Sequence, residues 1–96
     1  MVERTLTVRA RLGLHARAAA KLVRVASGFD SSVELKRVDS GIRADAKSIL
    51  SVLMLAASTG TSLQASVDGS DEEAAMAAID ELFAQGFGEM EPESAK

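Results

Sequence analysis

The sequence predicts one α+β domain in which a small antiparallel sheet carries its helices on one face. Two observations lead to this prediction. Segments of alternating apolar and polar residues are interspersed with segments of helical periodicity, in the order β-α-β-β-α-β-α. The first six of these segments form a split βαβ arrangement, which closes an antiparallel sheet. A length of 96 residues and a hydrophobic fraction of 47% suit one packed domain rather than two.

The first strand and the first helix have clear patterns. In residues 2–9 the apolar side chains fall on one side of an alternating segment, which predicts a half-buried strand. Residues 10–14 contain a glycine and are expected to form a loop. Residues 16–27 are rich in alanine and place apolar residues three to four positions apart. They predict an amphipathic helix that ends at Gly28.

A hairpin and a second helix are expected next. Residues 32–37 alternate again, and the turn-forming residues 39–41 predict that residues 41–45 pair back as a short strand. Residues 48–57 predict a helix, for which Ser48 is a natural N-cap.

One more strand and helix complete the predicted order. Residues 61–67 alternate and predict a fourth strand. Ser70 and Glu73 have the spacing of a capping box, in which each side chain binds the backbone N–H of the other residue. A third helix is therefore expected to begin there and to run to about Gln85.

The composition argues against several classes of function. Cysteine is absent, which removes disulfides and thiolate chemistry, and a single histidine argues against a metal site. No apolar run reaches the ~18–20 residues of a membrane span, and the N-terminus lacks a signal-peptide core. A cytoplasmic protein without membrane insertion is therefore expected. Tryptophan and tyrosine are absent, which argues against a stacking platform for single-stranded nucleic acid.

Charge is distributed unevenly along the chain, whose net charge is −3. Residues 1–48 carry ten lysines and arginines against five acidic residues, whereas residues 49–96 carry one lysine against nine acidic residues. The basic half favours an anionic partner or ligand, and the acidic half argues against duplex DNA. A solvated surface of mixed sign is the alternative. Residues 89–96 hold the only proline and three glutamates, and they are expected to form a flexible acidic tail on a domain of residues 1–88.

The only histidine, His15, stands where the predicted first helix begins. The first turn of a helix has unsatisfied N–H donors and a partial positive charge, which suit a bound anion. Arg17 adds a guanidinium that matches phosphate oxygens, and Lys21 and Arg24 extend a stripe of cations along the helix. An imidazole nitrogen can attack phosphorus, and Gly13 is expected to leave room for a partner to approach. A histidine that is only a surface or capping residue is the alternative.

Four separated segments of the chain read GLHARAA, KLVRVASGF, AKSILSVLML and TGT. In their order and spacing they resemble HPr, the family of histidine-containing phosphocarriers of the bacterial phosphoenolpyruvate-dependent sugar phosphotransferase system. The resemblance covers residues 2 to about 86. It implies an open-faced β-sandwich, with a four-stranded antiparallel sheet and three helices on one face.

The resemblance also implies a phosphocarrier function. Enzyme I is implied to phosphorylate His15 on Nδ1, and the phosphoryl group is implied to pass to a histidine on an EIIA domain. Arg17 is implied to stabilise charge during transfer, and we expect the backbone N–H groups of Ala16 and Arg17 to hold the phosphoryl oxygens. Ser48 matches a serine that HPr kinase/phosphorylase phosphorylates in some lineages. Such a carrier needs no cofactor, because its energy comes with the phosphoryl group.

Two positions depart from the family's pattern. Ala18 stands where relatives usually have proline, which fixes φ and withholds an N–H. Alanine supplies one more donor near the start of the helix but gives a less rigid turn. Leu12 stands where many relatives carry a small polar residue, so a hydrogen bond near His15 is expected to be missing. Both departures leave the chemistry in place and bear on its rate.

The predicted second helix is apolar nearly all round, since only Ser51 is polar in residues 49–57. A two-layer domain buries one side of such a helix, so Leu50 and either Leu53 or Met54 are expected to be partly exposed. An apolar patch beside a stripe of cations suits a docking surface. The resemblance to HPr implies that enzyme I and EIIA bind to this surface. A third helix that covers more of this surface is the alternative. The predicted docking residues are Lys21, Arg24, Ile49, Leu50 and Leu53.

The sequence therefore predicts a monomeric phosphoryl carrier rather than an enzyme, with enzyme I, EIIA domains and HPr kinase/phosphorylase as its partners. One alternative is a regulatory HPr-like module, in which phosphorylation of His15 or Ser48 controls partner proteins without sugar transport. Another is an enzyme that uses His15 as a general base, although no second catalytic group stands near it in the sequence. For Ser48, capping and regulation are compatible, because a helix N-terminus stabilises a phosphate.

Overall fold

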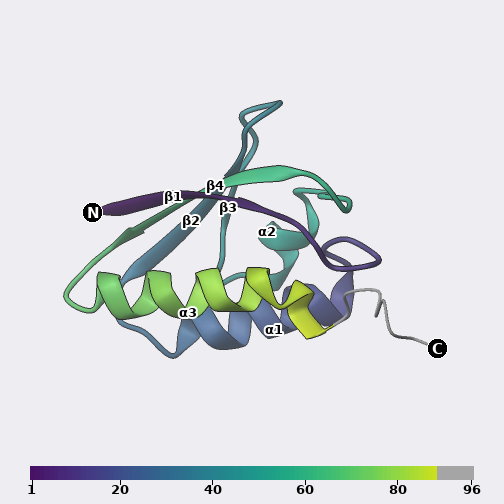
Figure 1. The fold of residues 1–96 in the computed structure, drawn as a ribbon. Coiled ribbons are helices and arrows are strands. Elements are labelled where there is room, and N and C mark those ends of the chain that lie inside the picture. Colours follow the sequence, from purple (N-terminus) through teal and green to yellow (C-terminus); the bar gives the residue numbers. More distant parts are fainter. Residues whose placement is uncertain (89–96) are drawn as a thin grey trace.

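The structure is a computed structural model that describes residues 1–88; the tail expected at residues 89–96 lies outside the described residues. Its elements follow the predicted order β-α-β-β-α-β-α (Figure 1). They are β1 (Val2–Thr7), α1 (Ala16–Ser27), β2 (Ser32–Arg37), β3 (Arg43–Asp45), α2 (Ile49–Leu53), β4 (Ser62–Asp68) and α3 (Glu72–Ala84), followed by a short 3-10 turn, η1 (Gly86–Gly88).

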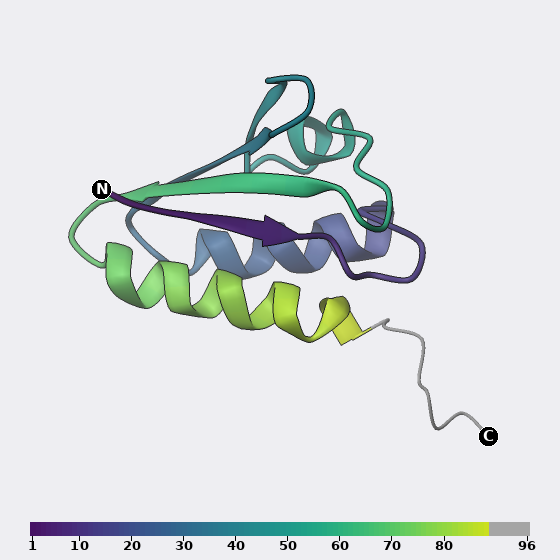
Figure 2. The same ribbon diagram turned by 45° about the horizontal axis from the view of Figure 1, so that its top comes forward.

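The four strands form one antiparallel sheet in the order β1-β4-β2-β3. Strand β4 lies between β1 and β2, with Leu63 opposite Leu6 and Ala65 opposite Leu35. Helices α1 and α3 lie side by side across one face of the sheet, and the opposite face is open (Figures 1 and 2). Helix α2 packs against α1 and β3. This is the open-faced α+β architecture that the resemblance to HPr implied.

The hydrophobic core lies between the sheet and the two long helices. Leu63, Ala65 and Val67 are buried at every second position of β4, as the alternation predicted. Leu22 of α1 and Phe83 of α3 belong to the same buried cluster. Each large apolar side chain that is fully buried contributes roughly 1.5–3 kcal/mol. This cluster therefore holds α1, and the residue that begins it, in a fixed position on the sheet.

The prediction of a second helix over residues 48–57 is wrong in its length. Helix α2 ends at Leu53, and Ala56 adopts the left-handed region with φ +50°. The residues on either side, Leu55 and Ala57, are buried, so the chain has to turn at Ala56 to bring both side chains into the core. Tertiary packing overrides the helical pattern of this segment.

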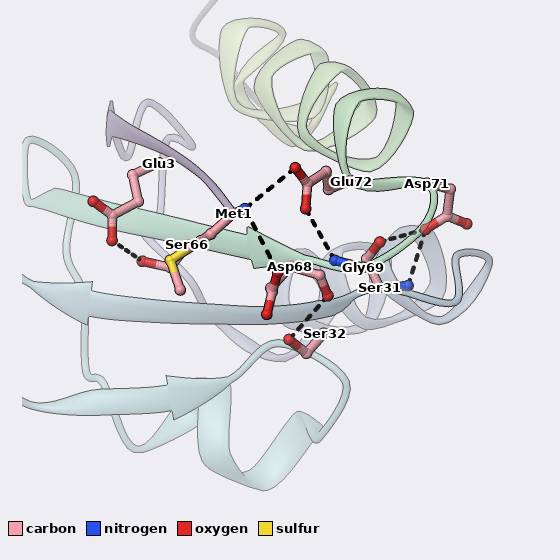
Figure 3. Close-up of polar contacts among 9 residues, drawn as sticks. All are labelled: Met1, Glu3, Ser31, Ser32, Ser66, Asp68, Gly69, Asp71 and Glu72. Carbon is pink, nitrogen blue, oxygen red and sulfur yellow. Dashed lines mark hydrogen bonds and ion pairs between the residues drawn. The ribbon is translucent and has the colours of Figure 1, made fainter.

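The capping box expected between Ser70 and Glu73 is also wrong. Helix α3 begins at Glu72, and the preceding residue, Asp71, makes no side-chain hydrogen bond that caps it. The carboxylate of Glu72 instead accepts a hydrogen bond from the Gly69 N–H at 3.1 Å (Figure 3). Residues 70–73 are all polar and suit the beginning of a helix. The local pattern therefore does not determine at which of them α3 begins.

A contact across the fold decides where α3 begins. The Asp71 carboxylate accepts hydrogen bonds from the N–H and the hydroxyl of Ser31, in the loop between α1 and β2 (Figure 3). It also accepts one from the N–H of Asp30 at 2.9 Å. The Ser31 hydroxyl first, and then the Asp30 N–H, lower the pKa of Asp71 below its usual value. Asp71 therefore serves to join α3 to the end of α1.

Candidate functional site

His15 is the N-cap residue of α1. Its backbone is extended, with φ −79° and ψ −176°, and its carbonyl accepts the first helical hydrogen bond, from the Ala19 N–H at 2.8 Å. The imidazole is half-buried, and its Nδ1 accepts a hydrogen bond from the Arg17 N–H at 3.3 Å. The structure thus places the histidine at the predicted junction and shows which ring nitrogen faces the helix.

The hydrogen bond from Arg17 determines what the imidazole can do chemically. A ring nitrogen that accepts a hydrogen bond carries the lone pair, so the proton of the neutral ring lies on Nε2. The Nδ1 lone pair faces the first turn of a helix of 12 residues. Unsatisfied N–H groups and the helix dipole favour negative charge at that end. A nucleophilic nitrogen and donors for an anion therefore meet in one place.

The loop before His15 closely approaches the segment that follows α2. Gly13 has φ +73°, and a Cβ at this position would lie 2.7 Å from the Ala57 carbonyl oxygen and 2.9 Å from the Ser58 Cα. The N–H of Leu14 donates to the same Ala57 carbonyl at 2.9 Å. The expectation that Gly13 leaves room for a partner is wrong, because the chain's own backbone occupies that space.

Thr59 makes a second connection between these two loops. Its hydroxyl donates a hydrogen bond to the Ala10 carbonyl at 2.6 Å. The backbone adds two more bonds, from the Val8 N–H to the Thr61 carbonyl at 2.9 Å and from the Gly60 N–H to the Val8 carbonyl at 2.8 Å. Sequence reasoning missed Thr59 as a support of the site. Its only signal was the TGT segment of the family resemblance.

The predicted stripe of cations contains residues in two different environments. Arg17 and Arg24 are exposed, in the first and last turns of α1. Lys21 lies between them and is half-buried, and its ammonium donates to the Phe87 carbonyl at 2.7 Å. Phe87 is buried beside Phe83, with the ring centroids 4.9 Å apart. Lys21 therefore also fastens the segment after α3 to α1, a role that sequence reasoning missed.

Large apolar side chains are exposed on α2 and at its end. Leu50 is 66% exposed and Met54 is 70% exposed, as the apolar pattern predicted. Ile49 is exposed and Leu53 is half-buried, whereas Val52 is buried in the core. This helix therefore presents an apolar surface to solvent.

Ser48 is the N-cap of α2, as predicted. Its hydroxyl accepts a hydrogen bond from the Ser51 N–H at 3.3 Å, and its side chain is half-buried. The Ser51 hydroxyl in turn accepts one from the Asp45 N–H at 3.0 Å, which joins α2 to β3. Ser48 thus stands at the start of the helix that carries the exposed apolar surface.

The two departures from the family's pattern lie on either side of His15. Ala18 is fully buried in the first turn of α1, and its N–H is one of the four that a helix leaves without a helical partner. Leu12 is 72% exposed, and its side chain has no polar group to offer the histidine. The first change therefore alters the donors at the helix end, and the second alters the surface around the site.

Within residues 1–88, no cluster of three or more histidine, cysteine or carboxylate side chains is arranged to hold a metal ion. No helix in this part of the chain combines the length and the hydrophobicity that crossing a membrane requires.

Comparisons with known sequences point to one family. A family model described as "PTS HPr component phosphorylation site" matches residues 2–85. The phosphocarrier protein HPr of Xylella fastidiosa strain Temecula1 is 49% identical over 89 residues, which cover 93% of this chain and 98% of the relative. The phosphocarrier protein NPr of Escherichia coli K12 is 41% identical over 88 residues, which cover 92% of this chain and 97% of the relative.

A solved structure agrees. The crystal structure of HPr-C-His from Thermoanaerobacter tengcongensis has a TM-score of 0.87 and a sequence identity of 36%, and the match covers 95% of this chain and 100% of that one. The family match runs from β1 to the end of α3, so it includes His15 and the first turn of α1. The chain therefore belongs to the HPr family, and it is a phosphocarrier protein rather than an enzyme.

Proposed function

We propose that the protein accepts a phosphoryl group on Nδ1 of His15 from enzyme I, which takes it from phosphoenolpyruvate, and passes it to a histidine of an EIIA domain. The observation that carries this proposal is the orientation of the imidazole, whose Nδ1 faces the first turn of α1. Family membership supports a phosphocarrier role, and the geometry supports the choice of the atom.

Each transfer exchanges one bond to phosphorus for another. The Nδ1 lone pair of His15 attacks phosphorus, the new nitrogen–phosphorus bond forms, and the bond to the donor atom of enzyme I breaks with its electron pair. No proton has to leave Nδ1, because the neutral ring carries its proton on Nε2. In the onward step the EIIA histidine is the nucleophile and His15 is the leaving group.

The first turn of α1 stabilises the phosphoryl group. Once phosphorus occupies the Nδ1 lone pair, the Arg17 N–H can turn from Nδ1 to a phosphoryl oxygen, and the Ala16 N–H lies beside it. The Arg17 guanidinium offers a planar fork of donors that stabilises charge during transfer. Ala18 contributes a backbone donor that proline lacks.

Partner docking uses the cations of α1 and the apolar surface of α2. An acidic partner meets the exposed Arg24, while Lys21 keeps some of its three donors available although it binds the Phe87 carbonyl. Leu50 supplies the apolar centre, and the half-buried Leu53 adds to it. Charge then mainly sets the rate of association, and apolar contact sets the lifetime of the complex. The proposed docking residues are Lys21, Arg24, Ile49, Leu50 and Leu53.

We also propose Ser48 as a regulatory phosphorylation site for HPr kinase/phosphorylase. A phosphate at this N-cap adds about −2 charge next to the apolar surface of α2, where an acidic partner docks. The start of a helix tolerates that charge, so the modification would weaken docking and leave the fold intact.

A second candidate function is regulatory, with phosphorylation of His15 or Ser48 controlling partner proteins without sugar transport. The matches to relatives named both HPr and NPr leave this alternative open. Both functions fit a monomer in the cytoplasm, and both use the same phosphohistidine. They differ in whether the phosphoryl group reaches an EIIA domain of a sugar transporter.

Phosphate incorporation tests the proposal. Purified protein is incubated with enzyme I and labelled phosphoenolpyruvate, and candidate EIIA domains are then added. We expect label that is labile in acid and stable in base, and that moves to at least one EIIA domain of a sugar transporter. Undiminished label in His15→Ala would contradict the site. Label that reaches no EIIA domain of a sugar transporter would favour the regulatory alternative.

A further inference from the structure

Arg37, at the end of β2, holds the backbone at the end of α2. Its Nη1 donates to the Leu55 carbonyl at 2.9 Å and to the Ala56 carbonyl at 3.1 Å. Its Nε and Nη2 donate to the two carboxylate oxygens of Asp39, at 2.9 Å and 2.8 Å. The side chain is 20% exposed. Because the guanidinium is rigid and planar, the bidentate bond to Asp39 fixes the direction of Nη1.

We call the Arg37 side chain, held by Asp39 and bound to the two carbonyls, the Arg37 clamp. Both of its side chains are charged at neutral pH. The Arg37 guanidinium, mainly through its hydrogen bond, lowers the pKa of Asp39 below its usual value. Hydrogen bonds between charged groups and backbone carbonyls are stronger than those between neutral groups. The clamp therefore binds the two carbonyls more firmly than a neutral side chain would.

The segment that the clamp binds has an unfavourable backbone conformation. Ala56 has φ +50°, a region that residues with a Cβ rarely adopt. Such a conformation persists only where the surrounding structure enforces it. Burial of Leu55 and Ala57 enforces it from the core, and the clamp enforces it from the surface.

The same segment supports the loop that leads to the histidine. Ala57 directly follows the clamped residues, and its carbonyl accepts the Leu14 N–H at 2.9 Å. The close approach at Gly13 leaves no space between the two backbone segments. A displacement of Ala57 therefore displaces the loop before His15 as well. Leu14 is the residue before His15, and a shift there changes the angle at which the imidazole meets α1.

We propose that Arg37 is a positioning residue for phosphoryl transfer at His15. It acts through the carbonyl of Ala57 and the N–H of Leu14, which together keep the N-cap residue in place. This inference rests on the proposed function. The competing explanation is a purely structural role. In that case Arg37 and Asp39 only stabilise the fold, in the same way as any other ion pair on the sheet.

Three variants separate the two roles. Arg37→Ala removes the clamp, and Asp39→Asn loosens it while leaving the guanidinium present. Arg43→Ala is the matched control, because Arg43 pairs with Glu34 at 3.2 Å on the same sheet. If Arg37→Ala fails to fold, Asp39→Asn takes its place in every comparison.

The first readout is hydrogen exchange of the Leu14 amide, compared with the amides of the central strand β4. Arg37→Ala should speed exchange at Leu14 by about tenfold more than at β4, because it opens the loop locally. Arg43→Ala should change both by the same factor. Equal changes in Arg37→Ala would mean that Arg37 only stabilises the whole fold, and would overturn the proposal.

The second readout is the rate of phosphorylation of His15 by enzyme I and phosphoenolpyruvate, measured where all variants are folded. Arg37→Ala should reduce this rate by about tenfold, or about 1.4 kcal/mol, and Asp39→Asn should reduce it by less. A rate equal to that of Arg43→Ala would overturn the proposal. The two failures can be told apart. If the proposed function is wrong, the unchanged protein is not phosphorylated. If the role of the clamp is wrong, hydrogen exchange shows it without enzyme I.

Discussion

Substitution of Gly13 by alanine puts a methyl group at the closest backbone approach of the site. At φ +73° a side chain costs about 1–2 kcal/mol, of which about 0.4–1 kcal/mol is offset because alanine restricts the unfolded chain. The new Cβ would also lie 2.7 Å from the Ala57 carbonyl oxygen, and such overpacking costs about 1–3 kcal/mol. We expect Gly13→Ala to lower the free energy of unfolding by about 1–4.6 kcal/mol in total.

Gly41→Ala is a matched control for this change. Gly41 has a similar φ of +79°, and a Cβ there would meet nothing within 4 Å. The two variants share the conformational effect and differ only in the overpacking. Because each kcal/mol shifts the melting temperature of a domain of this size by roughly 4–8 °C, Gly13→Ala should melt about 4–24 °C below Gly41→Ala.

Thermal unfolding and phosphorylation by enzyme I together test this reasoning. Phosphorylation of His15 should slow in Gly13→Ala and not in Gly41→Ala, because only the first change displaces the Ala57 carbonyl that holds Leu14. If the two variants melt within about 2 °C of each other, the overpacking is less than about 0.5 kcal/mol and the close approach at Gly13 is refuted.

Three further predictions concern other parts of the molecule. Ala18→Pro should leave the fold intact and change phosphoryl transfer by less than about tenfold, since the lost N–H has no helical partner; a loss of about a hundredfold would show that transfer depends on this donor. In surface-binding measurements with enzyme I, Arg24→Glu should slow association and Leu50→Ala should speed dissociation. Ser48→Asp should weaken binding without lowering the melting temperature. Unchanged binding of Ser48→Asp at low salt would show that Ser48 is a simple N-cap. Asp71 has a lowered pKa in the folded state, so its contribution to stability is present above its unfolded pKa of about 3.9 and is lost as the pH falls through the folded pKa. The free energy of unfolding, measured in urea, should therefore be higher for the native chain than for Asp71→Asn at neutral pH, and this difference should shrink below about pH 4. A difference that does not change with pH would contradict this prediction.

Local patterns were sufficient to predict most of the fold. The alternation in β4 fixed which side chains enter the core, and the N-cap preferences of serine placed the start of α2 at Ser48. The end of α2 was not predictable in this way, because burial of Leu55 and Ala57 forces a left-handed residue between them. The start of α3 was not predictable either, since Asp71 binds Ser31 from a distant part of the chain.

The candidate site divides in the same way. His15 and Arg17 are neighbours in the sequence, so their positions at a helix start followed from local reasoning. The contacts that hold the site were missed, because Arg37, Thr59 and Lys21 bind backbone carbonyls of residues remote in the sequence. A backbone carbonyl is present at every residue, so the sequence carries no mark of which one is bound.

The nitrogen that carries the phosphoryl group tests the central claim most directly. After phosphorylation by enzyme I, nitrogen NMR of the protein labelled in its imidazole distinguishes Nδ1 from Nε2 of His15, and the same sample reports the amide of Arg17. We expect the phosphoryl group on Nδ1, together with a large shift of the Arg17 amide as its hydrogen bond moves from Nδ1 to a phosphoryl oxygen. A phosphoryl group on Nε2, or an Arg17 amide that does not move, would contradict the role assigned to the first turn of α1.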